Sequence, residues 1–152
     1  MLTIIEKVIF LQDIDEFAEI PTEQLSHIAS ITEEIELEPN TTIIQQHEPA
    51  EALYLVLKGK VRLHRDGHEM MVVEEKGDFG LWSLFDKEQP NIATATTLEP
   101  TRLLKIDREE FYEIAADYVE ITQGIIKSIA RRLRHFGEKA LESGKEVQTN
   151  AK

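Results

Sequence analysis

The sequence predicts a mainly β fold of the α+β class: an antiparallel β-roll or jelly-roll barrel of about eight strands, with helices at both ends. Two observations carry this prediction. Short strand-like segments lie between residues 34 and 107, with turn residues every 8–12 positions. This spacing is typical of antiparallel rolls and barrels rather than of βαβ units. Helical periodicity appears before residue 32 and again after residue 107, so helices should flank the roll.

Length and composition favour one globular domain and exclude several other classes. A chain of 152 residues with 41% hydrophobic and 30% charged residues suits a single folded unit rather than a disordered one. It has no apolar run near the roughly 18 residues that a membrane span needs. The absence of cysteine removes disulfides, thiolate nucleophiles and Cys-based zinc sites. These features fit a cytoplasmic protein without direct membrane insertion.

The net charge of −12 argues against a nucleic acid as the main partner. Proteins that bind nucleic acids do so largely through cationic contacts with phosphate. One basic stretch, residues 121–140, is an exception, because it contains five cationic residues and only one acidic residue, Glu138. We interpret it as the basic half of a helix, favoured by the helix dipole. The alternative hypothesis is a specific anionic partner.

Residues 1–32 should form an N-terminal helical segment. Residues 3–11 have a helical pattern, and a second helix should begin near Pro21, with Thr22 as a plausible N-cap. The inward side chains expected from the two periodicities are Ile5, Val8, Ile9, Phe17, Leu25, Ile28, Ala29 and Ile31.

Residues 33–107 should form the β-roll. Lys58-Gly59-Lys60 and Asp66-Gly67 are both predicted to be tight hairpin turns. The run Phe79–Phe85 is too short for an independent helix and suits one or two helical turns inside a loop. The expected strands are Ile35–Leu37, Thr42–Gln45, Leu53–Leu57, Val61–His64, Met70–Val73, Ala93–Thr97 and Arg102–Ile106.

Residues 108–141 should form two C-terminal helices, and residues 142–152 a flexible tail. Asp107 with Glu110 three residues later has the pattern of a capping box, and Phe111 should face inward. Gly124 is expected to cost the second helix about 1 kcal/mol relative to Ala. One apolar stripe follows this helix at steps of three or four residues: Ile121, Ile125, Ile129, Leu133, Phe136 and Ala140.

Four segments, in this order along the chain, resemble the cyclic nucleotide-binding domain family. The effector domain of catabolite activators has the fold of this family. Ala52–Val61 resembles a hairpin of that family, and Gly77–Gly80 resembles the start of its phosphate-binding cassette. Pro90–Ala95 resembles the cassette's end, and Arg102–Asp107 with Phe111 resembles the strand and helix that follow. The resemblance extends from about Ile4 to Arg134. It implies a regulatory module with its ligand site in residues 77–96.

The cassette departs from the family pattern at the two positions that matter most. Cassettes that bind nucleotide usually read F-G-E-x-A-L-L and then P-R-x-A-T, where the Glu binds the ribose and the Arg pairs with the phosphate. Here Leu81 stands at the Glu position and Asn91 at the Arg position. Losing such a charge-assisted contact typically costs about 1.5–3 kcal/mol, or roughly a 10–100-fold weaker affinity.

We therefore expect a non-catalytic sensor or regulatory module with a degenerate cassette that acts through protein contacts or within a larger protein. The alternative is a genuine binder of cAMP, cGMP or another anionic ligand, held by backbone N–H groups at the start of the short helix and coupled to the C-terminal helix. No cofactor is certain. The cassette-equivalent residues are Phe79, Gly80, Leu81, Trp82, Ser83, Asn91, Ile92, Ala93 and Thr94.

Several individual residues allow two interpretations. Trp82 should fill a former pocket, or else stack on a ligand or partner. Asn91 should be a turn residue after Pro90, or else bind a neutral ligand. The stripe made by Ile121, Ile125, Ile129, Leu133 and Phe136 is either a homodimer or protein-partner seam or a lid over the roll.

Other functions have weaker support. His64 and His68 near Glu69 suggest a metal site, but they straddle a turn and lack the usual His-x-His pattern, so exposed histidines are the simpler account. No Ser/His/Asp set or GxxxxGK loop stands out, and an enzyme is not expected. Only about 12 polar residues follow Ala140, so no helix-turn-helix of the kind that transcription regulators carry is expected there.

Overall fold

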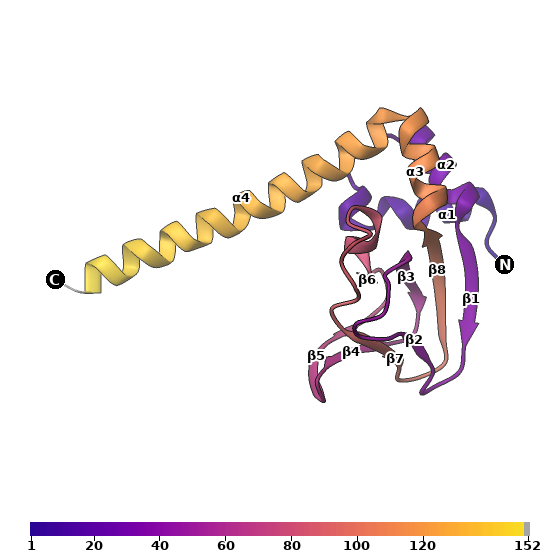
Figure 1. The fold of residues 1–152 in the computed structure, drawn as a ribbon. Coiled ribbons are helices and arrows are strands. Elements are labelled where there is room, and N and C mark those ends of the chain that lie inside the picture. Colours follow the sequence, from indigo (N-terminus) through magenta and orange to yellow (C-terminus); the bar gives the residue numbers. More distant parts are fainter. Residues whose placement is uncertain (151–152) are drawn as a thin grey trace.

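The computed structural model describes the backbone of residues 1–150 and the side chains of residues 1–144. The chain forms two antiparallel four-stranded sheets that face each other, with helices gathered at one end (Figure 1). The helices are α1 Ile4–Gln12, the 3₁₀ helix η1 Asp15–Phe17, α2 Thr22–Ile31, the 3₁₀ helix η2 Leu81–Leu84, α3 Arg108–Asp117 and α4 Val119–Asn150. The strands are β1 Glu33–Leu37, β2 Thr42–Ile44, β3 Ala52–Lys58, β4 Val61–Arg65, β5 His68–Val73, β6 Asp78–Phe79, β7 Thr94–Thr97 and β8 Thr101–Asp107.

The strand orders are β1-β8-β3-β6 in one sheet and β2-β7-β4-β5 in the other. This arrangement confirms the predicted mainly β roll of about eight strands with helices at both ends. One core cluster fills the space between the sheets, with Val56, Val61, Phe79 and Leu103 among its buried members. A larger cluster joins the outer side of β3 and β8 to the helices through Phe17, Ile28, Phe111, Ile125 and their neighbours.

The turn at Lys58-Gly59-Lys60 is not a hairpin, which corrects the prediction from sequence. β3 and β4 follow each other along the chain but belong to different sheets, so this turn carries the chain from one layer to the other. The local residues favour a tight turn in either case, because Gly59 has φ +105°. The Asp66-Gly67 turn does join paired strands, β4 and β5, as predicted.

The N-terminal helices differ from the prediction in three details. Thr3 is the N-cap of α1 and forms a reciprocal capping box with Glu6. Ile5 and Ile9 were expected to face inward but are 73% and 57% exposed, because Val8 and Leu11 form the face that meets the core. Thr22 is the first residue of α2, not its cap, and Pro21 occupies the N-cap position without a side-chain bond.

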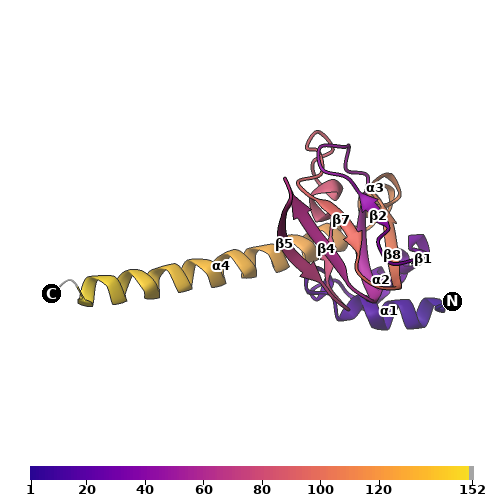
Figure 2. The ribbon, with the colours of Figure 1, turned by 90° about the horizontal axis from the view of Figure 1, so that it is seen from below.

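Asp107 caps α3 as expected, since its carboxylate accepts a hydrogen bond from the Glu110 backbone N–H at 3.2 Å. The predicted capping box is only half formed, because the Glu110 side chain does not bond back to the Asp107 backbone. The partner helix α4 begins against the body and then extends far beyond the roll (Figures 1 and 2). The helix continues to Asn150, whereas residues 142–152 were expected to form a flexible tail, of which residues 151 and 152 lie outside the described residues. No proline lies in this stretch to interrupt the backbone ladder.

The apolar stripe of α4 divides into two parts. Ile121 and Ile125 are fully buried against the chain's own core, and Ile129 is half-buried beside them. Leu133 and Phe136 are 66% and 60% exposed. The stripe is therefore a lid over the body in its first two turns and an uncovered surface beyond them.

The base of α4 is held against η1 by ion pairs. Glu19 bonds to Lys127 at 3.6 Å and also to Arg131, and Glu16 bonds to Arg132 at 2.7 Å. The basic stretch is thus matched by an acidic segment more than 100 residues earlier in the chain. Neither sequence interpretation of the stretch included this partner.

Candidate functional site

The site begins at a sharp turn between β6 and η2. Gly80 has φ +90°, a conformation that L side chains rarely adopt, and a Cβ there would lie 2.6 Å from the Ala52 carbonyl oxygen. The turn lets η2 start directly on β3. Ser83 then closes it, because its Oγ donates to the Gly80 carbonyl at 2.6 Å and its backbone N–H donates to the same oxygen at 3.0 Å.

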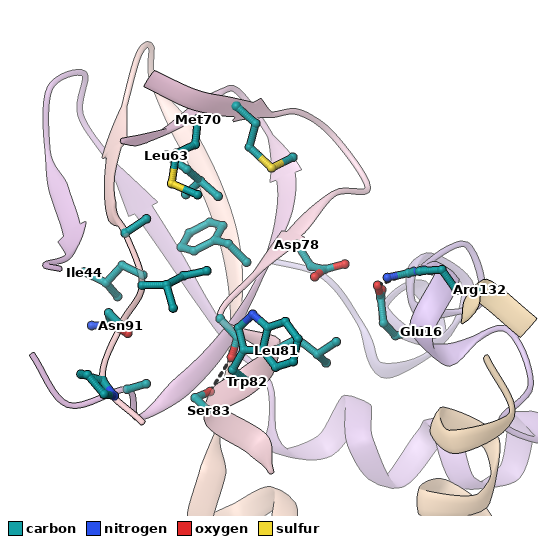
Figure 3. A pocket seen from close by; sticks show the side chains of 17 residues that line it. Glu16, Ile44, Leu63, Met70, Asp78, Leu81, Trp82, Ser83, Asn91 and Arg132 are labelled. Atoms are coloured by element: carbon teal, nitrogen blue, oxygen red, sulfur yellow. Dashed lines mark hydrogen bonds and ion pairs between the residues drawn. The ribbon is translucent and has the colours of Figure 1, made fainter. Parts of the chain in front are cut away.

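A cavity of about 260 Å³ lies between η2, the roll and the base of α4 (Figure 3). Eight of the nine residues predicted for the cassette line this cavity, and only Thr94 does not. Thr94 instead accepts a hydrogen bond from the Gln46 backbone at 3.0 Å. The apolar and small lining residues are Ile44, Ala50, Leu63, Met70, Met71, Phe79, Gly80, Leu81, Trp82, Pro90, Ile92 and Ala93. The polar ones are Glu16, Asp78, Ser83, Asn91 and Arg132.

Asn91 serves the backbone of a neighbouring loop. Its side-chain amide donates to the Gln45 carbonyl at 2.9 Å, and its own backbone N–H donates to Glu48 at 2.9 Å. The residue is buried. This supports the interpretation of Asn91 as a turn residue, because one of its two amide N–H donors already binds the protein's own backbone.

Trp82 does not fill the pocket, which corrects the favoured interpretation. Its side chain is 66% exposed and lines the cavity from the η2 side, while Ser83 and Leu84 are the buried residues of η2. A helix of one turn can direct only some of its side chains inward, and Leu84 takes that place. Ile92 on the far side of the cavity is also half-exposed. Phe79 is buried and stacks on Tyr54 with ring centroids 5.1 Å apart.

Three charged groups meet at the α4 side of the cavity: Glu16 from η1, Asp78 from β6 and Arg132 from α4 (Figure 3). Burial, with the neighbouring Glu16 carboxylate, raises the pKa of Asp78 to about 8. Burial opposes ionisation of Glu16 too, but hydrogen bonds with Asp78 and Arg132 outweigh it and lower the pKa of Glu16.

The electrostatics of the cavity do not favour an anion. Among the described residues, Arg132 is the only cation that lines it, and this guanidinium is already bonded to Glu16 at 2.7 Å. Lys87, the only cation between Gly77 and Pro100, lies instead in a separate depression beside Glu88 and Glu109. A phosphate that entered the cavity would meet two carboxyl groups before it met a free positive charge.

The histidines considered for a metal site have other surroundings. His64 Nε2 lies 3.1 Å from the Thr96 hydroxyl on the neighbouring strand, and His68 is exposed at the start of β5. Within the residues that the structure describes, no three His, Asp or Glu side chains are grouped closely enough to hold a metal ion.

The charged trio is the main part of the site that the sequence did not predict. Glu16 and Arg132 are 116 residues apart and follow no local motif. Asp78 lies beside the cassette glycines, but nothing in the sequence indicates that its carboxyl group faces η1 and α4. A weak indication did exist, since an acidic N-terminal half and a basic stretch at 121–140 are electrostatically complementary.

Within the described part of the chain, no helix combines the length and the apolar character that crossing a bilayer requires. Comparison with known proteins identifies a family. Residues 34–118, more than half of the chain, match the model of the cyclic nucleotide-binding domain.

Several curated relatives match at the sequence level, and two of them show the range of lengths. A CRP-like cAMP-activated global transcriptional regulator of Mycobacterium tuberculosis is 32% identical over 117 residues, which cover 72% of this chain and 52% of the regulator. The chain thus corresponds to about half the length of that relative. A lysophospholipase, nte1, of Aspergillus fumigatus is 29% identical over 131 residues, which cover 84% of this chain but 9% of the enzyme.

A solved structure agrees with these matches. The N-terminal domain of a transcriptional regulator from Streptomyces coelicolor superposes with a TM-score of 0.77 at 28% identity. The superposition covers 86% of this chain and 94% of that domain.

Proposed function

The chain belongs to the cyclic nucleotide-binding domain family, and from that premise we propose that it is a non-catalytic regulatory module whose phosphate-binding cassette is degenerate. One observation carries this proposal. The position at which the family places a phosphate-binding Arg holds the uncharged Asn91, whose side-chain amide donates a hydrogen bond to the Gln45 carbonyl. The ribose-binding position holds Leu81, which offers no hydrogen bond.

The charge of the cavity supports the same proposal. With Arg132 paired to Glu16, the cavity has no free cation among its described lining residues to offset the negative charge of a phosphate. Burying an anion without a partner costs several kcal/mol or more. We propose that the module passes regulatory signals through protein contacts, in the cytoplasm, alone or as part of a longer polypeptide.

Isothermal titration calorimetry with cAMP and then cGMP, up to millimolar ligand, tests the proposal. We expect no heat of binding and an unchanged melting temperature in both titrations. The M. tuberculosis regulator, titrated with cAMP under the same conditions, is the positive control. Binding at micromolar affinity or tighter would contradict a degenerate cassette.

A matched gain-of-function variant makes the outcome specific. Leu81→Glu combined with Asn91→Arg restores both family residues, so we expect this variant to bind nucleotide when the natural chain does not. Because Asn91 is buried, the variant must first show the circular dichroism spectrum and cooperative melting of the natural chain.

The alternative function is genuine binding of cAMP, cGMP or another anion, with α4 repositioned as the output. The observation that favours it is the cavity itself, which is open at the cassette and has Arg132 on its wall. Arg132 would have to exchange Glu16 for the ligand, so binding would loosen the base of α4 from η1. In the same calorimetric experiment, Arg132→Gln should then abolish the heat that the natural chain shows.

We further propose that the module acts as a homodimer through the uncovered part of α4. Ile121 and Ile125 do not belong to that surface, since the chain's own core buries them. Ile129, Leu133, Phe136 and Ala140 remain of the predicted stripe. Together with Ile126, an exposed residue that the predicted stripe did not include, they are spaced by three and four residues in alternation, which is the spacing of a coiled-coil seam.

A further inference from the structure

Three segments that are distant in the sequence meet at one point beside the cavity. Glu16 extends from η1, Asp78 from the cassette strand β6 and Arg132 from α4 (Figure 3). Glu16 is only 4% exposed, and its Oε1 accepts a hydrogen bond from Arg132 Nη2 at 2.7 Å. η1 and α4 are therefore joined directly through Glu16, and β6 faces that junction through Asp78.

The contact between Asp78 and Glu16 requires a proton. Both side chains line the same cavity, close enough for Glu16 to raise the pKa of Asp78. Because a carboxylate can only accept, one of the two must be protonated to donate a hydrogen bond to the other. Glu16 Oε2 is buried and has no hydrogen-bond partner among the described residues. A protonated Asp78 supplies the donor that this oxygen lacks, whereas an ionised Asp78 leaves two buried carboxylates in contact.

We propose that a proton shared by Asp78 and Glu16 fastens the cassette strand β6 to the unit formed by η1 and α4, and that loss of this proton separates the two. The inference gives the proposed regulatory module an input to α4 that needs no nucleotide, and so rests on the regulatory role proposed above. The proton acts where the cassette and the output helix meet.

The surrounding charges set the direction of the response. Asp15 on η1 adds further negative charge, and Arg132 on α4 is the cation that faces Asp78. From β3, which pairs with β6, the uncharged Leu55 lies opposite Asp78. On the approach to β6, Lys76 is bonded to Asp13 at 3.2 Å. When the shared proton leaves, repulsion between Asp78 and Glu16 thus acts in a site with one cation, already engaged by Glu16.

The junction between η1 and α4 should survive this change. Glu19 binds Lys127 and Arg131 through contacts that do not involve Asp78. Separation therefore occurs between β6 and the η1–α4 unit, not within the unit. Because burial and Glu16 raise the pKa of Asp78 to about 8, the change falls slightly above neutral pH.

Pulsed electron–electron resonance between two spin labels measures this separation. The sequence has no cysteine, so Lys58→Cys on β3 and Lys139→Cys on α4 introduce unique thiols at exposed positions. The labelled chain is diluted with unlabelled chain to remove distances between molecules. We expect the distance distribution to shift or broaden between pH 6.5 and pH 9.

Two nearly isosteric variants decide the origin of that change. Asp78→Asn keeps a donor for Glu16 and cannot ionise, so its distribution should be the same at both pH values. Glu16→Gln removes the repelling carboxylate and should also remove the response. Asp117→Asn, which changes an exposed Asp at the end of α3, is the matched control. Its distance distribution should change with pH as that of the natural sequence does.

The inference is overturned if the labelled natural chain shows no change with pH, or if Asp78→Asn retains the change. If Asp78→Asn does not fold, the behaviour of Glu16→Gln decides in the same way. No nucleotide is present in this experiment. Its failure is therefore distinct from a failure of the proposed function, which would appear as nucleotide binding in the calorimeter.

Discussion

At the scale of single residues, Asp78 has the most unusual environment in the cavity. The folded chain keeps its proton up to a pKa of about 8, because burial and Glu16 oppose its charge. The unfolded chain releases the same proton near pH 4. Between these values the native state binds more protons than the unfolded state, so each increase in pH lowers the free energy of unfolding.

We accordingly expect Asp78→Asn to stabilise the protein increasingly as pH rises. The melting temperatures of variant and natural chain should be closest near pH 4–5 and differ by several degrees at pH 8–9. Glu16, whose pKa is lowered, contributes in the opposite sense and loses its stabilising effect as pH falls through acidic values. Calorimetric melting from pH 4 to pH 9 measures the pH dependence due to each carboxyl group. A difference in melting temperature between Asp78→Asn and the natural chain that stays constant across this range would disprove the raised pKa of Asp78.

At this scale, the sequence named residues that the structure brings together where a family pattern exists, and it missed residues where distant segments meet. The cassette positions were placed in one cavity, except Thr94. The exposure of Trp82 was not predicted, because a one-turn helix in which nearly every residue is apolar shows no periodicity that would identify its buried side. Glu16 and Arg132 were missed because no local pattern connects residues 116 positions apart.

At the scale of elements, the packing of α4 depends on Gly124. A Cβ at this position would lie 2.8 Å from Ile20 Cγ1 and 3.0 Å from the Glu19 carbonyl oxygen. The glycine therefore allows α4 to approach the segment after η1, and the same close approach brings Lys127 and Arg131 to Glu19. Helix propensity alone would favour alanine by about 1 kcal/mol.

For this reason we expect Gly124→Ala to destabilise the fold, by about 1–3 kcal/mol, as overpacked sites typically do. Gly137→Ala is the matched control, since a Cβ there meets nothing within 4 Å and should be neutral or slightly stabilising. Urea unfolding followed by circular dichroism gives both free energies. A stabilised Gly124→Ala variant would mean that α4 does not lie this close to the body.

Element types were largely predictable because they depend on local periodicity, whereas sheet membership was not. β3 and β4 have the pattern of a hairpin, yet β3 pairs with β8 and β6, and β4 pairs with β7 and β5. A tight glycine turn fits both a hairpin and a crossing between layers. Only the long-range pairing of the two sheets distinguishes them.

At the scale of the whole molecule, α4 divides into a docked base and a projecting rod (Figures 1 and 2). Two buried isoleucines and three ion pairs hold the base, and Leu133 and Phe136 lie on the rod without a covering segment in the described part of the chain. Large apolar side chains repeated along one exposed helix face are typical of an interaction surface.

We expect sedimentation to give a molecular mass of about twice the monomer mass of 17.4 kDa. Leu133→Glu with Phe136→Glu should return it to the monomer, because each charge would be buried at the centre of the proposed seam. His135→Glu with Lys139→Glu is the matched control. It introduces two acidic residues at exposed positions of the same rod that do not belong to the proposed coiled-coil seam, and it should leave the dimer intact. Sedimentation velocity across a hundredfold range of concentration distinguishes the cases. A natural chain that stays monomeric throughout would remove the homodimer and leave the exposed face of α4 for a different protein.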